Sequence, residues 1–213
     1  MIQAILYDLD GVLVDAMALH EEAFLAALRV EGKIDLTQQE HQAAYAGLPT
    51  KVKVQRLIAE GKLEARYAEA VVKTKQALTE EYIHQRIHPE PQRMTLLEHF
   101  RPHFSLGCVT NCLRKNAVQL LMQSNLLRFF EECLVTNEDA APKPSPEPYR
   151  KACGILDVEP HKALVIEDHD VGLTSAWNAG CYSVKLPAYA DLTIPFVWEA
   201  IKKAEAQDRM EKL

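Results

Sequence analysis

The stretch that decides the fold is residues 4–11, Ala-Ile-Leu-Tyr-Asp-Leu-Asp-Gly. A short apolar run of this kind predicts a buried β-strand. Two carboxylates, Asp8 and Asp10, follow at once, and Gly11 allows a sharp turn. In a parallel α/β sheet, ligands bind beyond the carboxyl ends of the strands, so these acids are candidates for an active site. Because Asp and Gly are also common in surface turns, the stretch alone leaves both interpretations open.

Composition narrows the class of protein. The chain has 213 residues, of which 48% are apolar and 25% charged, and this mixture predicts a folded globular protein rather than a disordered one. The length suits one domain, or a domain with a sizeable insertion. A formal net charge of −6 argues against non-specific binding to nucleic acid, which needs a basic surface.

The cysteine content and the hydropathy pattern indicate the cellular compartment of the protein. Five cysteines, an odd number without a Cys-x-x-Cys pair, argue against a disulfide framework and against a zinc site. We therefore expect reduced thiols and a cytoplasmic protein. No basic stretch followed by a long apolar segment opens the sequence, and no apolar run approaches a membrane-spanning length, so we expect neither a signal peptide nor a membrane span.

Residues 16–86 show only helical periodicity. We expect helices over residues 17–31, 37–46, 50–60 and 63–85, with Thr37 as the N-cap of the second. His20 falls on the apolar stripe of the first helix, where a histidine is most often a core or hinge residue. Lys75 projects from the apolar face of the last helix, which we expect to comprise Tyr67, Val71, Leu78 and Tyr82. It is there either as a lysine that keeps its ammonium in water or as a ligand for a substrate phosphate. The pattern predicts that this segment forms a helical bundle inserted after the first strand.

From residue 92 onward, helices and strands alternate. The expected strands cover residues 104–109, 132–135, 163–166 and 181–184, and a helix separates each from the next. A terminal helix is expected from Pro195. This alternation predicts a Rossmann-like parallel sheet covered by helices on both faces. The expected fold class is therefore α/β, with an all-helical insertion.

Four polar clusters follow strands or lie in the loops between them. They are Asp8 with Asp10, Thr110 with Asn111, Lys143 alone, and Glu167 with Asp168. Each has an ordinary structural explanation by itself, such as a helix cap, a solvated loop charge or an acidic first helical turn. If the strands are parallel, however, all four lie at one edge of the sheet. Carboxylates that converge there suit Mg²⁺, which would let an acidic site accept a phosphoryl group.

These motifs, in this order, resemble those of the haloacid dehalogenase superfamily. The matching stretches are Asp-Leu-Asp-Gly-Val at 8–12, Thr-Asn at 110–111, Lys-Pro-Ser-Pro-Glu-Pro-Tyr at 143–149 and Glu-Asp-His-Asp-Val-Gly at 167–172. A helical cap directly after the first motif is similar to the subgroup of phosphoglycolate phosphatase and β-phosphoglucomutase. The resemblance implies a core of residues 1–15 and 87–213 and a cap of residues 16–86.

The resemblance also implies a role for each motif. Asp8 would be the nucleophile that forms an aspartyl phosphate, and Asp10 the general acid and base. Thr110 and Asn111 would hydrogen-bond the transferred phosphoryl group, and Lys143 would pair with the nucleophile and the phosphate. The metal ligands for Mg²⁺ would be Asp8, the backbone carbonyl of Asp10, and Asp168, with Glu167 as a direct or indirect helper.

The expected activity is a Mg²⁺-dependent phosphatase acting on a small phosphorylated metabolite. A sugar phosphate, phosphoglycolate and a nucleotide all stay open as substrates, and His20, Thr50 and Lys75 of the cap are candidates for binding them. One alternative is a mutase similar to β-phosphoglucomutase, although Thr50 stands near the place where that enzyme has an arginine. The other is a non-catalytic module that binds a phosphorylated metabolite. Neither a nucleic acid nor a membrane partner is expected, and the sequence decides no oligomeric state.

Overall fold

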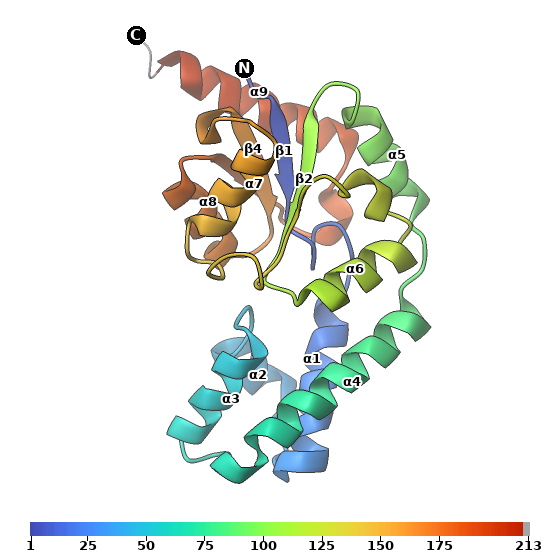
Figure 1. The fold of residues 1–213 in the computed structure, drawn as a ribbon, viewed down its shortest axis with the longest axis vertical. Helices are drawn as coiled ribbons and strands as arrows, with labels where there is room; N and C mark the ends of the chain where they lie inside the picture. The colour runs from blue at the N-terminus through green and yellow to red at the C-terminus, as the bar shows by residue number, and fades with distance from the viewer. Residues whose placement is uncertain (211–213) are drawn as a thin grey trace. The chain divides into compact units, whose positions relative to one another are not determined.

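The structure is a computed structural model that describes residues 1–210 of the chain (Figure 1). It divides into two compact units. One is formed by Met1–Asp15 and the residues from His88 onward, and the other by Ala16–Ile87. We call them the core unit and the helical unit and describe each by itself. Residues 211–213, which the expected core includes, lie outside the described part of the chain.

The core unit alternates strands and helices, as expected from the sequence. Its elements are β1 (Ala4–Tyr7), α5 (Pro91–Phe100), β2 (Ser105–Val109), α6 (Arg114–Gln123), β3 (Leu134–Val135), α7 (Glu147–Ile155), β4 (Ala163–Glu167), α8 (Asp170–Ala179), β5 (Tyr182–Lys185) and α9 (Ile194–Met210). The strands form one sheet in the order β3-β2-β1-β4-β5, and every pairing is parallel. The predicted α/β fold with a parallel sheet is confirmed. Strand β3 is shorter than predicted, with two residues instead of four.

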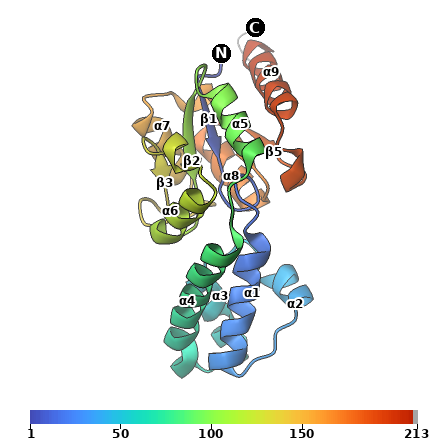
Figure 2. The ribbon, with the colours of Figure 1, turned by 90° about the vertical axis from the view of Figure 1, so that its right-hand side faces the viewer.

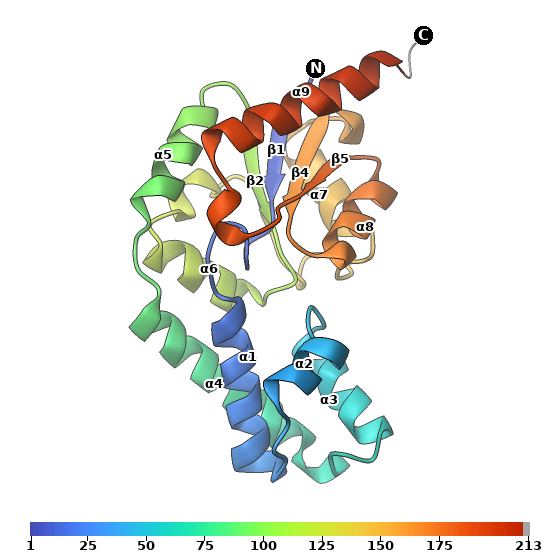
Figure 3. The ribbon, with the colours of Figure 1, turned by 180° about the vertical axis from the view of Figure 1, so that it is seen from behind.

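Strand β1 lies at the centre of the sheet because its sequence suits burial on both faces. All four of its residues are fully buried, as is typical of a parallel strand covered by helices on either side. Helices α7 and α8 cover the face seen in Figure 1, and α9 covers the opposite face, seen in Figure 3. Trp198 of α9 packs on Phe100 of α5, with ring centroids 5.3 Å apart.

The helical unit contains four α-helices. They are α1 (Met17–Ala27), α2 (Gln38–Ala44), α3 (Thr50–Ala59) and α4 (Ala68–Arg86), and α1 and α4 run side by side (Figure 2). The predicted cap of α2 is confirmed: Thr37 Oγ1 accepts from the Glu40 amide at 3.2 Å, and the Glu40 carboxylate accepts from the Thr37 amide at 2.8 Å. The unit has its own apolar core, which includes Phe24, Tyr45 and Leu57.

Two helices of this unit differ from the sequence prediction. The first continues past Ala27 as a π-helical turn over Leu28–Gly32, and the last begins at Ala68 after a 3₁₀ turn over Ala65–Tyr67. The buried face of α4 steps by four residues through Val71, Lys75, Thr79 and Ile83, so it lies beside the face predicted through Leu78 and Tyr82. Lys75 is on the buried face, as predicted. No helix within residues 1–210 is long and apolar enough to cross a membrane.

Candidate active site

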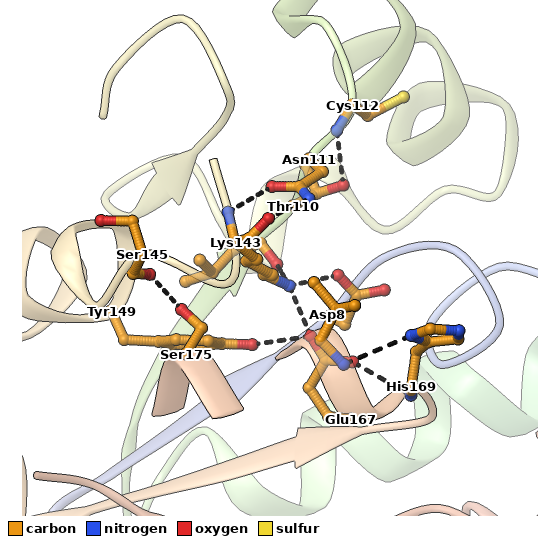
Figure 4. A network of polar contacts seen from close by, with 12 residues as sticks. Asp8, Thr110, Asn111, Cys112, Lys143, Ser145, Tyr149, Glu167, His169 and Ser175 are labelled. Carbon is orange, nitrogen blue, oxygen red and sulfur yellow. Dashed lines mark hydrogen bonds and ion pairs between the residues drawn. The ribbon is translucent and has the colours of Figure 1, made fainter. Parts of the chain in front are cut away.

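The four predicted polar clusters lie together at the carboxyl edge of the core sheet. The central strand β1 pairs with β2 and β4 so that Tyr7 is level with Cys108 and with Ile166. Asp8 is therefore level with the last residue of β2 and the last residue of β4, which is Glu167. The loop between β3 and α7 brings in Lys143, and Figure 4 shows these side chains converging. Parallel pairing is the reason for this convergence.

The turn after β1 explains why a glycine follows the two acids. Gly11 has a φ of +87°, in the left-handed region that a glycine adopts without strain. Its amide donates to the carbonyl of Val14 at 2.8 Å, and the Val14 amide donates to the carbonyl of Leu9 at 2.9 Å. The chain thus reverses within a few residues of Asp8, which leaves Asp10 partly exposed at the edge of the sheet.

Lys143 is the centre of the polar network. Its ammonium donates to Asp8 Oδ1 at 2.5 Å, to Glu167 Oε1 at 2.6 Å and to the carbonyl of Val109 at 2.7 Å. All three N–H donors are thereby used, and the side chain is buried. Burial alone lowers the pKa of a lysine, but the carboxylates of Asp8 and Glu167 outweigh this effect and raise the pKa of Lys143. The ammonium therefore stays charged next to Asp8.

Asn111 fixes the loop that carries Lys143. Its Oδ1 accepts from the Lys143 amide at 2.8 Å, and its Nδ2 donates to the Lys143 carbonyl at 3.2 Å (Figure 4). The Asn111 side chain is therefore engaged by this backbone. Thr110 is buried beside it, and its Oγ1 accepts from the amide of Cys112 at 3.0 Å.

Glu167 is held by groups from three elements. Its Oε1 accepts from Lys143 and also from the hydroxyl of Tyr149 in α7, at 2.9 Å. Gly172 in α8 lies so close that a Cβ there would be 1.7 Å from the same oxygen. Tyr149 and Gly172 were not predicted as site residues, although both belong to the motif stretches at 143–149 and 167–172. Their contacts depend on how α7 and α8 pack, and no periodicity reveals that.

The acidic groups of this edge fit a divalent cation. Carboxylate oxygens of Asp8, Glu167 and Asp168 lie within 4.8 Å of one another. Burial raises the pKa of Asp8; Lys143 opposes this rise, and the neighbouring carboxylates add to it. Burial, with the carboxylate of Glu167, raises the pKa of Asp168 to about 6. One ammonium does not balance three carboxylates, and a hard cation with oxygen ligands, such as Mg²⁺, would relieve the excess negative charge.

The three predicted substrate-binding residues of the cap all belong to the helical unit. Lys75 Nζ lies 3.4 Å from Nδ1 of His20, so the structure brings these two predicted residues together. Thr50 is the first residue of α3 and is partly exposed. A further lysine on the same helix, Lys53, contacts His41 and was not singled out from the sequence.

Comparisons with known proteins agree with this geometry. The family model described as "Haloacid dehalogenase-like hydrolase" matches residues 5–186. A plasmid-borne phosphoglycolate phosphatase of Cupriavidus necator is 38% identical over 80 residues, which are 38% of this chain and 35% of that protein. The pyrophosphatase PpaX of Bacillus cereus is 29% identical over 182 residues, 84% of this chain and 80% of that protein.

A solved structure shows the same fold. The β-phosphoglucomutase of Clostridium difficile superposes with a TM-score of 0.81 at 19% identity, covering 97% of this chain and all (100%) of that one. At this level of identity the similarity establishes the fold alone. The family model covers most of the chain, including the ends of β1 and β4, which carry the acidic groups of the site. The chain therefore belongs to the haloacid dehalogenase-like hydrolase family.

Proposed function

We propose that this protein is a Mg²⁺-dependent phosphatase that hydrolyses a small phosphomonoester through an aspartyl-phosphate intermediate, acting in the cytoplasm. The observation that carries the proposal is the contact of 2.5 Å between Lys143 Nζ and Asp8 Oδ1, in a cluster of three carboxylates. A carboxylate fixed by an ammonium at a sheet edge suits attack on phosphorus. Two relatives, named as a phosphoglycolate phosphatase and a pyrophosphatase, support a phosphorylated substrate.

In the proposed reaction the two aspartates have different tasks. An oxygen of Asp8 forms a bond to phosphorus while the bond from phosphorus to the ester oxygen breaks. Asp10 gives its proton to the leaving alkoxide, which departs as an alcohol. Asp10 then takes a proton from a water molecule, whose oxygen attacks phosphorus and releases Asp8 and inorganic phosphate. The partial exposure of Asp10 suits a group that exchanges protons with water.

Lys143, Thr110 and Asn111 would stabilise the charge that develops on the transferred group. Lys143 balances the charge of Asp8 and of the phosphoryl oxygens, and the hydroxyl of Thr110 donates to one of these oxygens. Because the Asn111 amide holds the Lys143 backbone, we assign Asn111 mainly to positioning. Its hydrogen bond to the phosphoryl group stays a prediction.

The residues that would hold Mg²⁺ are Asp8, the backbone carbonyl of Asp10, Asp168 and Glu167. When bound, the cation neutralises charge on the phosphoryl oxygens and lets the carboxylate approach them. Glu167 Oε1 accepts two hydrogen bonds, and Oε2 accepts one from the His169 amide at 3.4 Å. The clustering of three carboxylate oxygens within 4.8 Å supports this ligand set.

The helical unit would act as the cap that selects the substrate, with His20, Thr50 and Lys75 among its binding residues. A small phosphorylated metabolite is the proposed partner, and the net charge of −6 makes a nucleic acid an unsuitable one. A mutase is the second candidate because of the shared fold with β-phosphoglucomutase. Thr50 counts against it, since a threonine supplies no charge for a second phosphate.

A panel of phosphorylated metabolites, assayed for phosphate release with and without Mg²⁺, tests this proposal. Asp8→Asn keeps the size of the side chain and removes the nucleophile, so turnover should disappear while the circular dichroism spectrum and thermal unfolding stay close to those of the parent. Full activity in this variant would contradict the covalent mechanism. Isomerisation of β-glucose 1-phosphate without net phosphate release would favour the mutase instead.

A further inference from the structure

Two cysteines of the core unit lie side by side. Cys153 in α7 and Cys181, which stands between α8 and β5, have their sulfur atoms 3.9 Å apart. Both side chains are buried in the apolar core of the unit, and both are free thiols. Because the S–S bond of a disulfide is about 2.05 Å long, the two sulfurs stand about 2 Å beyond bonding distance. A small movement would therefore be enough to join them.

Packing and hydrogen bonds fix the backbones that carry the two thiols. Helices α7 and α8 pack against each other (Figure 1), and Arg150 in α7 donates to the carbonyl of Asn178, in the last turn of α8, at 2.8 Å. The chain leaves α8 at Gly180, and the amide of Cys181 donates to the Ala176 carbonyl at 3.0 Å. The fold thus brings the thiols together before any bond forms, which favours a reaction between them.

A hydrogen bond between the two thiols makes a thiolate easier to form. Burial raises the pKa of a thiol, and burial together with Cys153 raises the pKa of Cys133 to about 12. In the pair, the S–H···S hydrogen bond outweighs burial and lowers the pKa of Cys153, and it raises the pKa of Cys181, which donates the proton. The pair therefore presents a thiolate, the form of cysteine that reacts with oxidants, more readily than Cys133 does.

A small oxidant can approach the pair from the β5 edge of the sheet. Cys181 lines a cavity of about 320 Å³ together with Trp177, Gly180 and Tyr182. The side chain of Trp177 is exposed, so the cavity meets solvent on that side. A water molecule takes up about 30 Å³ in the liquid, and hydrogen peroxide is only slightly larger, so the cavity has room for it next to Cys181.

We propose that Cys153 and Cys181 are an oxidation site of the core unit, at which hydrogen peroxide converts the two thiols into a reversible disulfide. The thiolate of the pair attacks one oxygen of the peroxide, the O–O bond breaks, and the hydroxide that leaves takes up a proton to become water. The other cysteine gives up its proton and attacks the sulfur of the resulting sulfenic acid, the S–O bond breaks, and a second water leaves. The two thiols together lose two electrons and two protons, and the peroxide accepts them.

The disulfide would form one helical turn away from a residue that holds the active site. Tyr149 precedes Cys153 by one turn of α7, and its hydroxyl donates to Glu167 Oε1 at 2.9 Å (Figure 4). Because this hydrogen bond already has a normal length, a displacement of α7 that closes the disulfide would weaken it. We therefore expect oxidation to weaken Mg²⁺ binding. This part rests on the proposed function, whereas formation of the disulfide does not.

Mass spectrometry of the full chain after treatment with hydrogen peroxide tests the oxidation site. We expect the parent protein to lose two hydrogen atoms and to regain them with dithiothreitol, and a peptide map to show Cys153 joined to Cys181. Cys153→Ser and Cys181→Ser should each abolish this change, whereas Cys133→Ala, which removes another thiol of the same apolar core, should keep it. Unchanged thiols, a gain of oxygen atoms alone, or a bond to Cys133 in the parent would refute the site. The map of the parent decides the question even if a variant does not fold.

Calorimetric titration with MgCl₂ tests the link to the metal site. We expect the dissociation constant of the parent to be about three- to tenfold larger after peroxide treatment, and dithiothreitol to restore it. Cys153→Ser, treated in the same way, should keep its constant, which separates the disulfide from oxidation elsewhere in the chain. Equal constants for the reduced and the oxidised parent would refute the link to the metal site. If the reduced parent binds no Mg²⁺ at all, the proposed metal site fails, and mass spectrometry alone decides the oxidation site.

Discussion

A Cβ atom at Gly172 would lie 1.7 Å from Oε1 of Glu167, so the first turn of α8 packs directly against that carboxylate. The same oxygen accepts hydrogen bonds from Lys143 and Tyr149. Glu167 is thus restrained by a glycine on one side and by two donors on the other. A side chain that belongs to the proposed metal site is therefore positioned by residues that need not touch the metal.

Gly172→Ala should be destabilising, although alanine is normally the better helix residue. The added methyl group overlaps the Glu167 carboxylate, which must move together with its partners. We expect a loss of about 1–3 kcal/mol in the free energy of unfolding, and weaker Mg²⁺ binding. Urea unfolding and calorimetric titration with MgCl₂ measure the two effects.

Gly154→Ala is the matched control for that substitution. Gly154 lies within α7, and a Cβ there meets nothing within 4 Å. We expect this variant to be about 0.5–1 kcal/mol more stable than the parent, because alanine loses less conformational entropy in a helix. Equal stability changes in the two variants would show that close packing on Glu167 is not what requires Gly172.

Tyr149→Phe should weaken the metal site without removing any of its ligands. The substitution deletes the hydroxyl that donates to Glu167 Oε1 at 2.9 Å and leaves the ring in place. Because a ligand that loses an orienting hydrogen bond is less well placed, we expect Mg²⁺ to bind about tenfold more weakly. Calorimetric titration gives the dissociation constant, and an unchanged value would mean that Lys143 alone positions Glu167.

Mg²⁺ should stabilise the folded protein through Asp168. At about 100 times its dissociation constant, a ligand that binds only the native state adds about 2.7 kcal/mol to the free energy of unfolding. We expect Asp168→Asn to lose most of this gain. Asp170→Asn should keep it, because the Asp170 side chain is exposed and pairs with Lys185. Thermal unfolding with and without MgCl₂ makes the comparison, and an equal loss in both variants would argue against Asp168 as a ligand.

Lys53 should make the free energy of unfolding depend on pH between about 8 and 10.5. Burial, together with the positive charge of Lys75, lowers the pKa of Lys53 from 10.5 to about 8, so the unfolded chain binds more protons than the native one between these two values. Stability therefore rises with pH through this window, and the full cost of the buried charge is present below pH 8. Allowing for partial solvent screening, we expect Lys53→Met to be about 1–2 kcal/mol more stable than the parent at pH 7.

The advantage of Lys53→Met should shrink as the pH rises from 8 towards 10.5, where Lys53 of the parent becomes neutral in both states. Urea unfolding across this range measures it. Lys51→Met serves as the reference for removing an exposed charge from α3. A constant difference between the Lys53→Met variant and the parent at every pH would mean that the lysine is not desolvated.

Much of the fold could be predicted from local patterns. The run Ala4–Tyr7 is apolar on both faces and is followed by two acids, and the structure places it at the centre of the sheet. Thr37 was also predicted correctly as the N-cap of α2, because its contacts with Glu40 are local in the sequence. The face of α4 was predicted less well, because its buried line includes Thr79 in place of Leu78, and only packing chooses between neighbouring faces of a helix.

The sequence by itself determined the order of strands and helices, the family, and the polar residues that follow β1, β2 and β4. These depend on periodicity and on short motifs, which are local properties of the chain. Only the tertiary structure decided how the residues contact one another. Asn111 holds the Lys143 backbone, Tyr149 holds Glu167, and Lys53 contacts His41. Each of these contacts joins residues from different elements, so the packing of those elements determines it.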